Sequence, residues 1–297
     1  MMKTYQTYFS LLFILMAFTV NAQDIAYGFK AGLNFNRFIS DSEVDANGVN
    51  LEEFTGKTGF HVGATFTWKA TELMGLRGEL LYSQKGGKRR FDGPSFYDIQ
   101  IDPNGTGDII ETTGNRRMFV SVANSYIDIP VMGYAKLFKW LEVYAGANVG
   151  VLITSSAVGD LQYSGVTSTG VSVEQFDYEF NYRFGSDEVG EFEASGQPEQ
   201  VQVGNLSYDL PRRAGAYYEY DRDRGNLYKA LDLGLVGGLS VYLNEGLYVT
   251  VRANYGLTDI TRTEADISYQ SRDNGSFIER NDKDRNFAIQ TSIGFSF

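Results

Sequence analysis

Apolar and polar residues alternate along much of the chain, in eight segments of about ten residues or more. The last segment, "NFAIQTSIGFSF", places aromatic and branched residues at every second position and Ala, Gln, Ser and Gly between them. Alternation at period two indicates a β-strand whose two faces meet different surroundings. The segments span residues 25–38, 57–68, 76–84, 119–137, 141–153, 227–243, 247–257 and 286–297.

The lengths and connections of these segments favour a membrane barrel. Strands of soluble proteins typically have about five or six residues, whereas a tilted strand needs roughly 9–11 to cross a bilayer. Short connections alternate strictly with long ones, which cover 39–56, 85–118, 154–226 and 258–285. Outer-membrane barrels combine short periplasmic turns with long outer loops. We therefore predict an all-β fold, an eight-stranded antiparallel up-and-down transmembrane β-barrel with long extracellular loops and both termini in the periplasm.

The end of the chain is predicted to close this barrel. Pairing of the last segment with the first leaves no sheet edge exposed to lipid. Phe295 and Phe297 resemble the C-terminal recognition signal of the outer-membrane insertion machinery, which is therefore an expected partner. An interfacial aromatic girdle is also expected at the periplasmic strand ends. Its members are Tyr27, Trp68, Trp140, Tyr248 and Phe297.

The opposite faces of the strands carry polar residues that would fill the barrel. The predicted lumenal network consists of Lys30, His61, Arg77, Glu79, Asp128, Glu142, Asp232 and Arg252, joined by Tyr126, Tyr144, Gln290 and, by its alternation, Tyr248 as well. Three cations and four carboxylates predict ion pairs, because unpaired buried charge is strongly unfavourable. Eight strands leave an interior that side chains just fill, which favours a closed, stabilising interior over a selective pore or proton path.

Composition excludes several kinds of chemistry. The chain has no cysteine and one histidine, so thiolate metal sites, cysteine nucleophiles and multi-histidine zinc sites are excluded. His61, near the outer end of its strand, is the one candidate for the rim histidine of a barrel hydrolase, but a single histidine is a weak signal. We expect no enzymatic activity, cofactor or metal. A net charge of −11 makes nucleic acid an unlikely partner.

The first residues have the layout of a secretory signal peptide. Lys3 precedes an apolar run from Phe9 to Val20 and a small-residue exit at Asn21-Ala22. The run is short for a membrane anchor, which needs about 20 apolar residues. We expect cleavage of residues 1–22, which leaves a single domain over 23–297.

The long loops are the expected working surface. Residues 156–225 contain 13 acidic residues and 5 arginines, a net charge of −8. Within them "FDYEFNYRF" alternates like a strand above the membrane, and exposed tyrosines there and in "GAYYEYDRDRG" would make a contact surface; a merely protective loop is the alternative. "DRDRGN" lacks the ligand spacing of a calcium loop. "KGGKRRF" at 85–91 is expected in an outer loop, near lipopolysaccharide phosphates or the acidic loop.

Four stretches resemble the PorT-like outer-membrane β-barrels of Bacteroidota. They are "YGFKAGLNFNRF", "SYIDIPVMGYAKLF", "LEVYAGANVGVLI" and "LDLGLVGGLSVYL". The resemblance is most specific at Tyr126, Asp128 and Pro130, and at Asp232 and Gly234. It implies an eight-stranded barrel with a closed, polar-filled lumen in the cell outer membrane of a Gram-negative envelope. The family's namesake belongs to the type IX secretion machinery, while the loop at 154–226 is longer than usual for the family.

The expected function is that of a non-enzymatic accessory or structural subunit of a cell-envelope complex for secretion or assembly. Its expected surroundings are the lipid bilayer and lipopolysaccharide, with further envelope proteins as partners. The alternative is a surface-exposed binding protein or adhesin that acts through the acidic loop at 154–226. An open pore would need a wider lumen.

Overall fold

The computed structural model describes residues 25–100, 109–193, 199–210, 212–273 and 275–297, and the predicted signal peptide lies outside them. Eight long strands build the main sheet: β1 (Ile25–Ile39), β3 (Lys57–Lys69), β4 (Met74–Gln100), β5 (Ile109–Phe138), β6 (Leu141–Thr167), β12 (Leu231–Tyr242), β13 (Leu247–Gly256) and β16 (Arg285–Ser296). The other strands are β2 (Glu52–Thr55), β7 (Ser172–Arg183), β8 (Phe192–Glu193), β9 (Glu199–Val203), β10 (Leu206–Leu210), β11 (Arg213–Ala214), β14 (Ile267–Asp273) and β15 (Ser276–Glu279).

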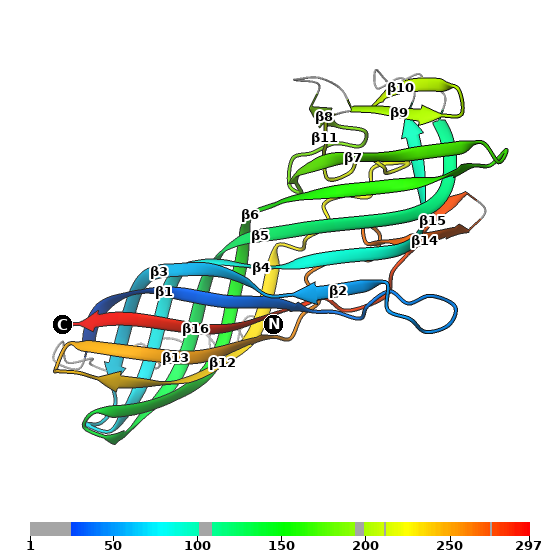
Figure 1. Cartoon of the computed structure of the whole chain (residues 1–297). Coiled ribbons are helices and arrows are strands. Elements are labelled where there is room, and N and C mark those ends of the chain that lie inside the picture. Colours follow the sequence, from blue (N-terminus) through cyan, green and yellow to red (C-terminus); the bar gives the residue numbers. More distant parts are fainter. Residues whose placement is uncertain (1–24, 101–108, 194–198, 211, 274) are drawn as a thin grey trace, which may run out of the picture.

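The eight long strands form a closed ring (Figure 1). Their order is β1–β3–β4–β5–β6–β12–β13–β16, and β16 pairs again with β1. Every pair in the ring is antiparallel. Closure satisfies the backbone hydrogen bonds of all eight strands without leaving an edge. The predicted eight-stranded antiparallel up-and-down barrel is confirmed.

The last residues of the chain complete this closure, as predicted. Gly28 lies opposite Ser296 in the β1–β16 register. The Tyr27 amide donates to the Phe297 carbonyl (3.1 Å), and the Phe297 amide donates to the Tyr27 carbonyl (2.8 Å). The sheet is therefore paired as far as the C-terminal residue.

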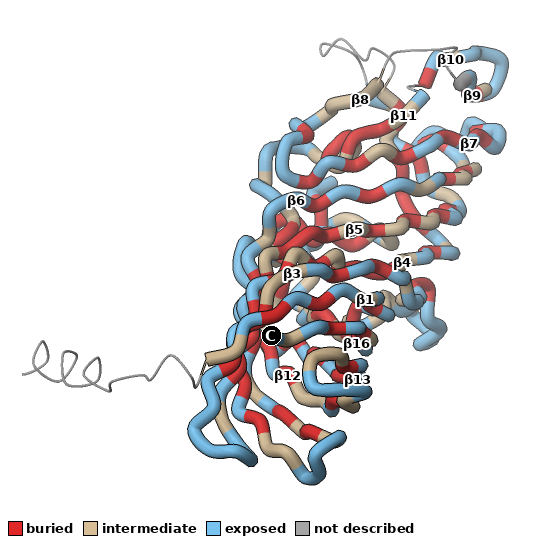
Figure 2. Tube along the Cα trace, turned by 90° about the vertical axis from the view of Figure 1, so that its left-hand side faces the viewer, coloured by how far each residue is buried: buried red, intermediate tan, exposed pale blue. Residues whose placement is uncertain are grey.

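The two faces of the ring follow the alternation of the sequence. Buried and exposed residues alternate along each ring strand (Figure 2). Phe29, Leu33 and Ile293 are among the large apolar side chains that point outward, while Lys30 and Gln290 are buried inside. Tyr27, Trp68, Trp140 and Phe297 are exposed, as a girdle requires. Tyr248 is buried in the interior instead. The prediction that it belongs to the girdle was therefore wrong, and the prediction from the alternation that it faces the lumen is confirmed.

Short and long connections lie at opposite ends of the ring. The turns after β3, β5 and β12 are short and lie beside the two ends of the described chain; we call this the terminal end. The long connections gather at the opposite end, the far end (Figure 1). In the described part of the chain, no helix has the length and apolarity needed to cross a bilayer.

Much of what the sequence assigned to long outer loops is sheet. β4, β5 and β6 contain 27, 30 and 27 residues and continue past the ring. The predicted loops at 85–118 and 154–226 are therefore largely strand. Gly86 lies where β4 leaves the ring, at a φ of 141° that favours glycine. Gly86 and Gly87, which were expected in an outer loop, thus belong to a continuing strand.

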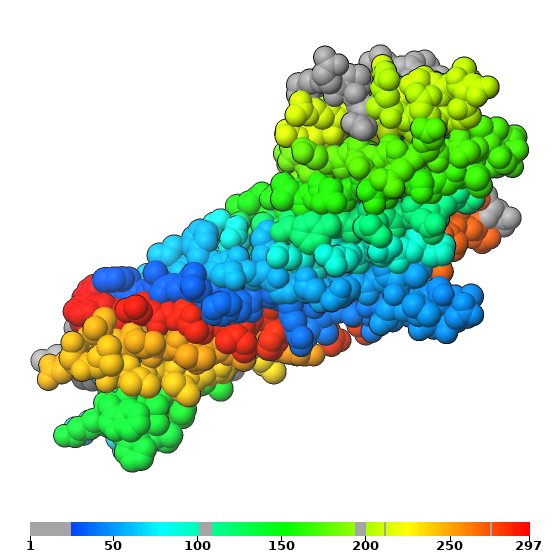
Figure 3. Space-filling model, viewed as in Figure 1, coloured from blue at the N-terminus to red at the C-terminus, as the bar shows by residue number. Residues whose placement is uncertain are grey.

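These continued strands form a second body, which we call the extension (Figure 3). It comprises residues 86–100, 109–123 and 155–167 together with β2, β7–β11, β14 and β15. β7 pairs with β6 from Ser156 opposite Arg183 onward, as the alternation of "FDYEFNYRF" predicted. The extension has its own apolar core, built around the rings of Tyr97, Tyr163, Phe176, Tyr178 and Phe180.

This core corrects the predicted tyrosine contact surface. Tyr178 and Tyr182 of "FDYEFNYRF" are buried, and so are Tyr217 and Tyr218 of "GAYYEYDRDRG". Their rings were expected at the surface because the segment lay in a presumed loop. In β7, every second side chain faces the core and the acidic residues between them face outward. Tyr217 and Tyr218 lie instead in a turn that packs against the same core.

Candidate functional site

The barrel interior holds stacked layers of ion pairs, and the first lies toward the terminal end. The Arg77 guanidinium donates to both carboxylate oxygens of Glu142 at 2.7 and 3.1 Å. It also donates to the Tyr242 hydroxyl at 3.1 Å. Tyr134 and Tyr248 place their rings 5.3 and 5.9 Å from the guanidinium carbon. Such a planar, bidentate pair suits arginine, whose fixed fork matches a carboxylate.

The second layer is centred on Glu79. Its carboxylate accepts from Lys30 Nζ at 2.7 Å and from Arg252 Nη1 at 2.7 Å. Arg252 Nε also donates to the Gln290 side-chain oxygen at 2.5 Å. One carboxylate thus joins β1, β4 and β13 across the ring.

His61 lies within this polar interior and away from the rim. Its Nδ1 is 2.7 Å from Asn34 Oδ1, and its Nε2 is 2.9 Å from Ser292 Oγ. His61 is only 1% exposed and Ser292 only 3%, so a substrate could not reach the pair. His61 faces the interior, as predicted, and lies in the far-end half of β3, which begins at Lys57. Its contacts are those of a buried side chain whose ring nitrogens are satisfied.

The third layer lies toward the far end and contains a residue that sequence reasoning missed. Lys85 Nζ donates to Asp128 at 2.8 Å and to Asp232 at 2.9 Å. Asn148 also donates to Asp128 (3.1 Å), and Asn286 to Asp232 (3.0 Å). The expectation that the start of "KGGKRRF" lies in an outer loop is therefore wrong for Lys85.

The sequence did contain a signal for Lys85. It shares the odd-numbered face of its strand with Arg77, Glu79 and Ser83, all buried. Extending that alternation past Gln84 places Lys85 inside. With it, the interior has four cations and four carboxylates, and every one of them belongs to an ion pair. The structure thus places the eight predicted lumenal residues inside the ring, and seven of them in ion pairs.

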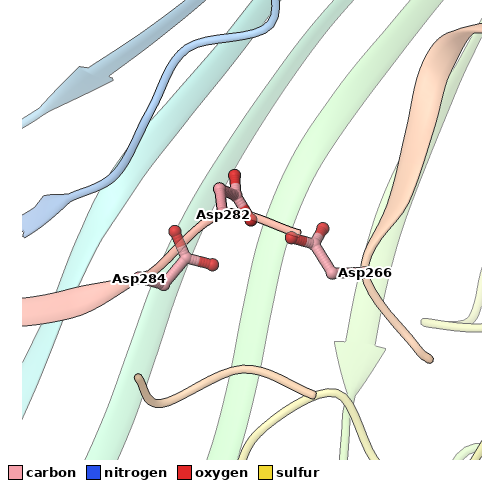
Figure 4. Close-up of side chains that lie close together, drawn as sticks. All are labelled: Asp266, Asp282 and Asp284. Atoms are coloured by element: carbon pink, nitrogen blue, oxygen red, sulfur yellow. The ribbon is translucent and has the colours of Figure 1, made fainter. Parts of the chain in front are cut away.

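A further charged cluster lies beyond the third layer, at the far-end rim of the ring. Glu52 of β2 forms ion pairs with Arg89, at very close range, and with Arg280 at 2.8 Å. Arg280 also pairs with Asp282 at 2.5 Å. Asp266 and Asp284 lie beside them, with the Asp266 carboxylate pointing toward Asp282 (Figure 4). Burial raises the pKa of Asp266 well above its usual range, although the Arg89 and Arg280 guanidinium groups act in the opposite direction. Residue spacing along the chain does not reveal this cluster, because its members come from four separate segments.

The parts of the extension are held together by ion pairs as well as by its aromatic core. Arg116 of β5 is completely buried and pairs with Glu219 at 2.6 Å. Arg272 pairs with Asp98 at 2.5 Å, and Arg224 joins Asp221 and Glu279. The "DRDRGN" stretch is thus occupied by ion pairs and a turn, since Asp223 accepts from the Gly225 amide at 2.7 Å.

Comparison with solved structures finds other outer-membrane proteins at very low identity. Ail, the attachment invasion locus protein of Yersinia pestis, is 9% identical with a TM-score of 0.34, over 92% of this chain and 99% of that one. OprG of Pseudomonas aeruginosa is 9% identical with a TM-score of 0.31, over 92% and 95%. The outer membrane protease OmpT of Escherichia coli is 8% identical with a TM-score of 0.27, over 95% and 98%. Likenesses this weak carry no argument about function, and no curated protein matches the chain.

A family model gives the decisive comparison. The model described as "Outer membrane protein beta-barrel domain" matches residues 21–262, which is most of the chain. The match includes seven of the eight ring strands and most of the extension. The closed ring, its apolar outer face and its polar interior are the features expected of such a protein. The chain therefore belongs to the outer membrane protein beta-barrel domain family.

Proposed function

We propose that this outer-membrane protein is a closed, non-enzymatic anchor that holds the extension outside the cell. The extension would act there as a rigid platform that binds another protein. The observation that carries this proposal is the continuation of β4, β5 and β6 from the ring into the extension. Strands of 27 to 30 residues give the platform a fixed position relative to the membrane. A flexible loop would need no such framework. The partner we propose is another protein of the cell envelope, with this chain as an accessory subunit of a secretion or assembly complex.

The proposed orientation places both termini in the periplasm and the extension outside the cell. It is supported by the sorting of short turns to the terminal end and long connections to the far end. The chain has no cysteine, so single cysteines can report the location of each end. We expect Glu174→Cys in β7 to react with a membrane-impermeant maleimide in intact cells. Glu245→Cys, in the turn after β12, should react only after permeabilisation, and the reverse pattern would contradict this orientation.

Charge is the feature by which the platform would recognise a partner. On β7 the apolar side chains face the core, while Glu174, Asp177 and Glu179 are exposed. With a net charge of −8 over residues 156–225, this face would attract a basic surface and accelerate association with it. The resemblance to PorT-like barrels of Bacteroidota supports an envelope complex as the setting.

Affinity purification from gently solubilised membranes tests this function. The tagged chain should recover one partner in stoichiometric amount. Reversing two charges of the platform, Glu174→Lys with Asp177→Lys, should lower that recovery at least about tenfold, because like charges now oppose a basic partner. Glu245→Lys, an exposed charge at the terminal end, is the matched control and should recover the partner as wild type does. A wild-type chain that purifies alone would count against the complex.

A second candidate, a surface-binding protein, is favoured by a cavity in the extension. It has a volume of about 650 Å³ and is lined by Asp98, Glu219, Tyr220, Arg272 and Phe277, among others. That volume falls in the range of ligand pockets, roughly 300–1,000 Å³. If the chain is a surface-binding protein, it should purify without a membrane partner and bind material from outside the cell. The same purification therefore separates the two candidates.

A further inference from the structure

The outward face of the ring carries a group of cations where the ring meets the extension. Arg285 is the first residue of β16, Arg37 lies near the end of β1, and Lys88 and Arg90 lie in β4 just past Gly86. We call these four cations the basic rim. Arg37 and Arg90 are exposed, and Lys88 and Arg285 are half-buried. The alternation of each strand turns their side chains to the face that meets lipid along the ring.

Two members of the basic rim are neighbours across β1 and β16. Arg37 lies opposite Phe287 in the register of these strands, and Arg285 is two residues before Phe287 on the same face. The Arg37 guanidinium carbon lies 5.4 Å from the centre of the Phe287 ring, a cation–π contact that holds it at the surface. The Nε of Arg285 is buried and has no hydrogen-bond partner among the described residues. It is a donor that lacks an acceptor.

The members on β4 lie beside the end of β1. Phe38 packs so closely against Gly87 that a Cβ atom on the glycine would lie 2.8 Å from the Phe38 ring. Arg37 directly precedes Phe38, and Lys88 directly follows Gly87. The contact between the two inner residues therefore brings the two cations together on the outer face.

The basic rim has no anionic partner in the described part of the chain. Arg117 on the neighbouring β5 pairs with Asp92 at 3.1 Å, whereas the four rim cations form no ion pair with any described residue. Glu53 lies opposite Arg90 in the β2–β4 register, yet no ion pair joins them. The acidic segment 154–226, expected as one possible partner of "KGGKRRF", supplies none either. In a chain of 37 acidic and 26 basic residues, this arrangement indicates an anion from outside the chain.

The basic rim lies at the level where the apolar outer wall of the ring ends. The outward positions of β1 are Tyr27, Phe29, Ala31, Leu33, Phe35 and then Arg37. The ten steps from Tyr27 to Arg37 span about 25 Å along the barrel axis, at a rise of about 3.3 Å and a tilt of about 40°. The apolar band of an outer-membrane barrel is also about 25 Å tall. The rim is therefore at the level of the lipid headgroups next to the extension.

We propose that the basic rim binds the phosphate groups of a lipid headgroup in that leaflet. In the proposed orientation, on which only the identity of the leaflet rests, the lipid is the phosphorylated glycolipid of the outer leaflet, lipopolysaccharide. Arginine and lysine bind phosphate oxygens through charge-assisted hydrogen bonds. A phosphate at the rim would supply the acceptor that Arg285 Nε lacks. Because the four cations lie on β16, β1 and β4, the lipid would occupy one side of the ring.

Titration of the purified full-length chain in detergent tests this site. The probes are lipid A with both phosphates and the same lipid A after enzymatic removal of its phosphates. Native mass spectrometry should show that the phosphorylated form binds at least about tenfold more tightly, because each rim cation contributes roughly fivefold to the binding of an anionic lipid. Inorganic phosphate at the same concentration should not displace the lipid. Displacement would assign the rim to free phosphate and overturn the lipid assignment.

Glutamine variants connect this binding to the rim. Arg37→Gln with Lys88→Gln should weaken the binding of phosphorylated lipid A about 25-fold, or about fivefold for each lost charge, and leave that of the dephosphorylated form unchanged. Arg212→Gln with Arg222→Gln removes two exposed cations between β10 and β12. This pair is the matched control and should bind as wild type does. Should the rim variant fold poorly, Arg90→Gln alone should weaken binding about fivefold.

Three results would each overturn the site: equal binding of both forms of lipid A by the wild-type chain, wild-type affinity in the rim variant, or an equal loss in the control. Failure of the lipid site is distinguishable from failure of the proposed function. Lipid binding in detergent does not depend on which way the chain lies in the membrane, and cysteine labelling measures that orientation separately.

Discussion

At the scale of single residues, the interior depends on the matching of charges. Lys85 is the clearest case because one ammonium group serves two carboxylates, Asp128 and Asp232. Removing one member of a buried pair is far more damaging than the pair's own net contribution, since its partner remains charged and buried. In the third layer, removal of Lys85 would leave two such partners.

We therefore predict that Lys85→Met lowers the free energy of unfolding by about 3–5 kcal/mol. Lys139→Met, which removes an exposed lysine at the terminal end, is the matched control and should change it by less than about 0.5 kcal/mol. Urea unfolding of the two variants and the wild type in the same detergent measures the difference. Equal stabilities for the two variants would show that the layer contributes nothing specific.

At the scale of the elements, β16 combines closure of the ring with a predicted insertion signal. Phe297 exchanges two backbone hydrogen bonds with Tyr27, while its side chain is exposed and its ring centroid lies 6.3 Å from that of Phe295. The backbone and the side chain of one residue can therefore serve separate purposes. The backbone closes the sheet, and we propose that the Phe295 and Phe297 side chains are read by the insertion machinery.

Two variants separate these purposes. Phe297→Ala keeps both backbone hydrogen bonds, so a loss of membrane-inserted protein of several-fold in cells is expected only if the side chain is recognised. Deletion of Phe297 should reduce insertion at least as strongly. Refolding into detergent, without cellular machinery, should proceed for Phe297→Ala as for wild type. Normal insertion of Phe297→Ala in cells would contradict the signal.

The ring strands were predictable, and the extension only in part, for a physical reason. In the ring, one face meets lipid and the other meets polar side chains, so alternation such as that of residues 25–38 is strong. In β4 beyond Gly86 both faces are covered or charged, and the double glycine resembles a turn. β7 kept its alternation because only one face is covered. The aspartate cluster, by contrast, forms only when residues 266 and 282–284 meet in space.

At the scale of the whole molecule, we propose that the protein is a sealed anchor that carries a platform. The layers of ion pairs cross the ring from the terminal end to the far end, and their members are almost completely buried. Because side chains can fill an eight-stranded ring, we expect no continuous path for ions through it. Because β4, β5 and β6 continue from the ring into the extension, they fix the position of the extension relative to the ring. Sequence predicted the polar interior, but the fourth cation and the burial of the tyrosines required the fold.

Single-channel recording in planar lipid bilayers tests the central claim, that the barrel is a closed anchor, most directly. The purified full-length chain should give no conductance above the background of the bilayer, over a wide voltage range. A known outer-membrane porin, inserted from the same detergent, serves as the positive control. Stable, stepwise conductance from the wild-type chain would show an open lumen and contradict the account.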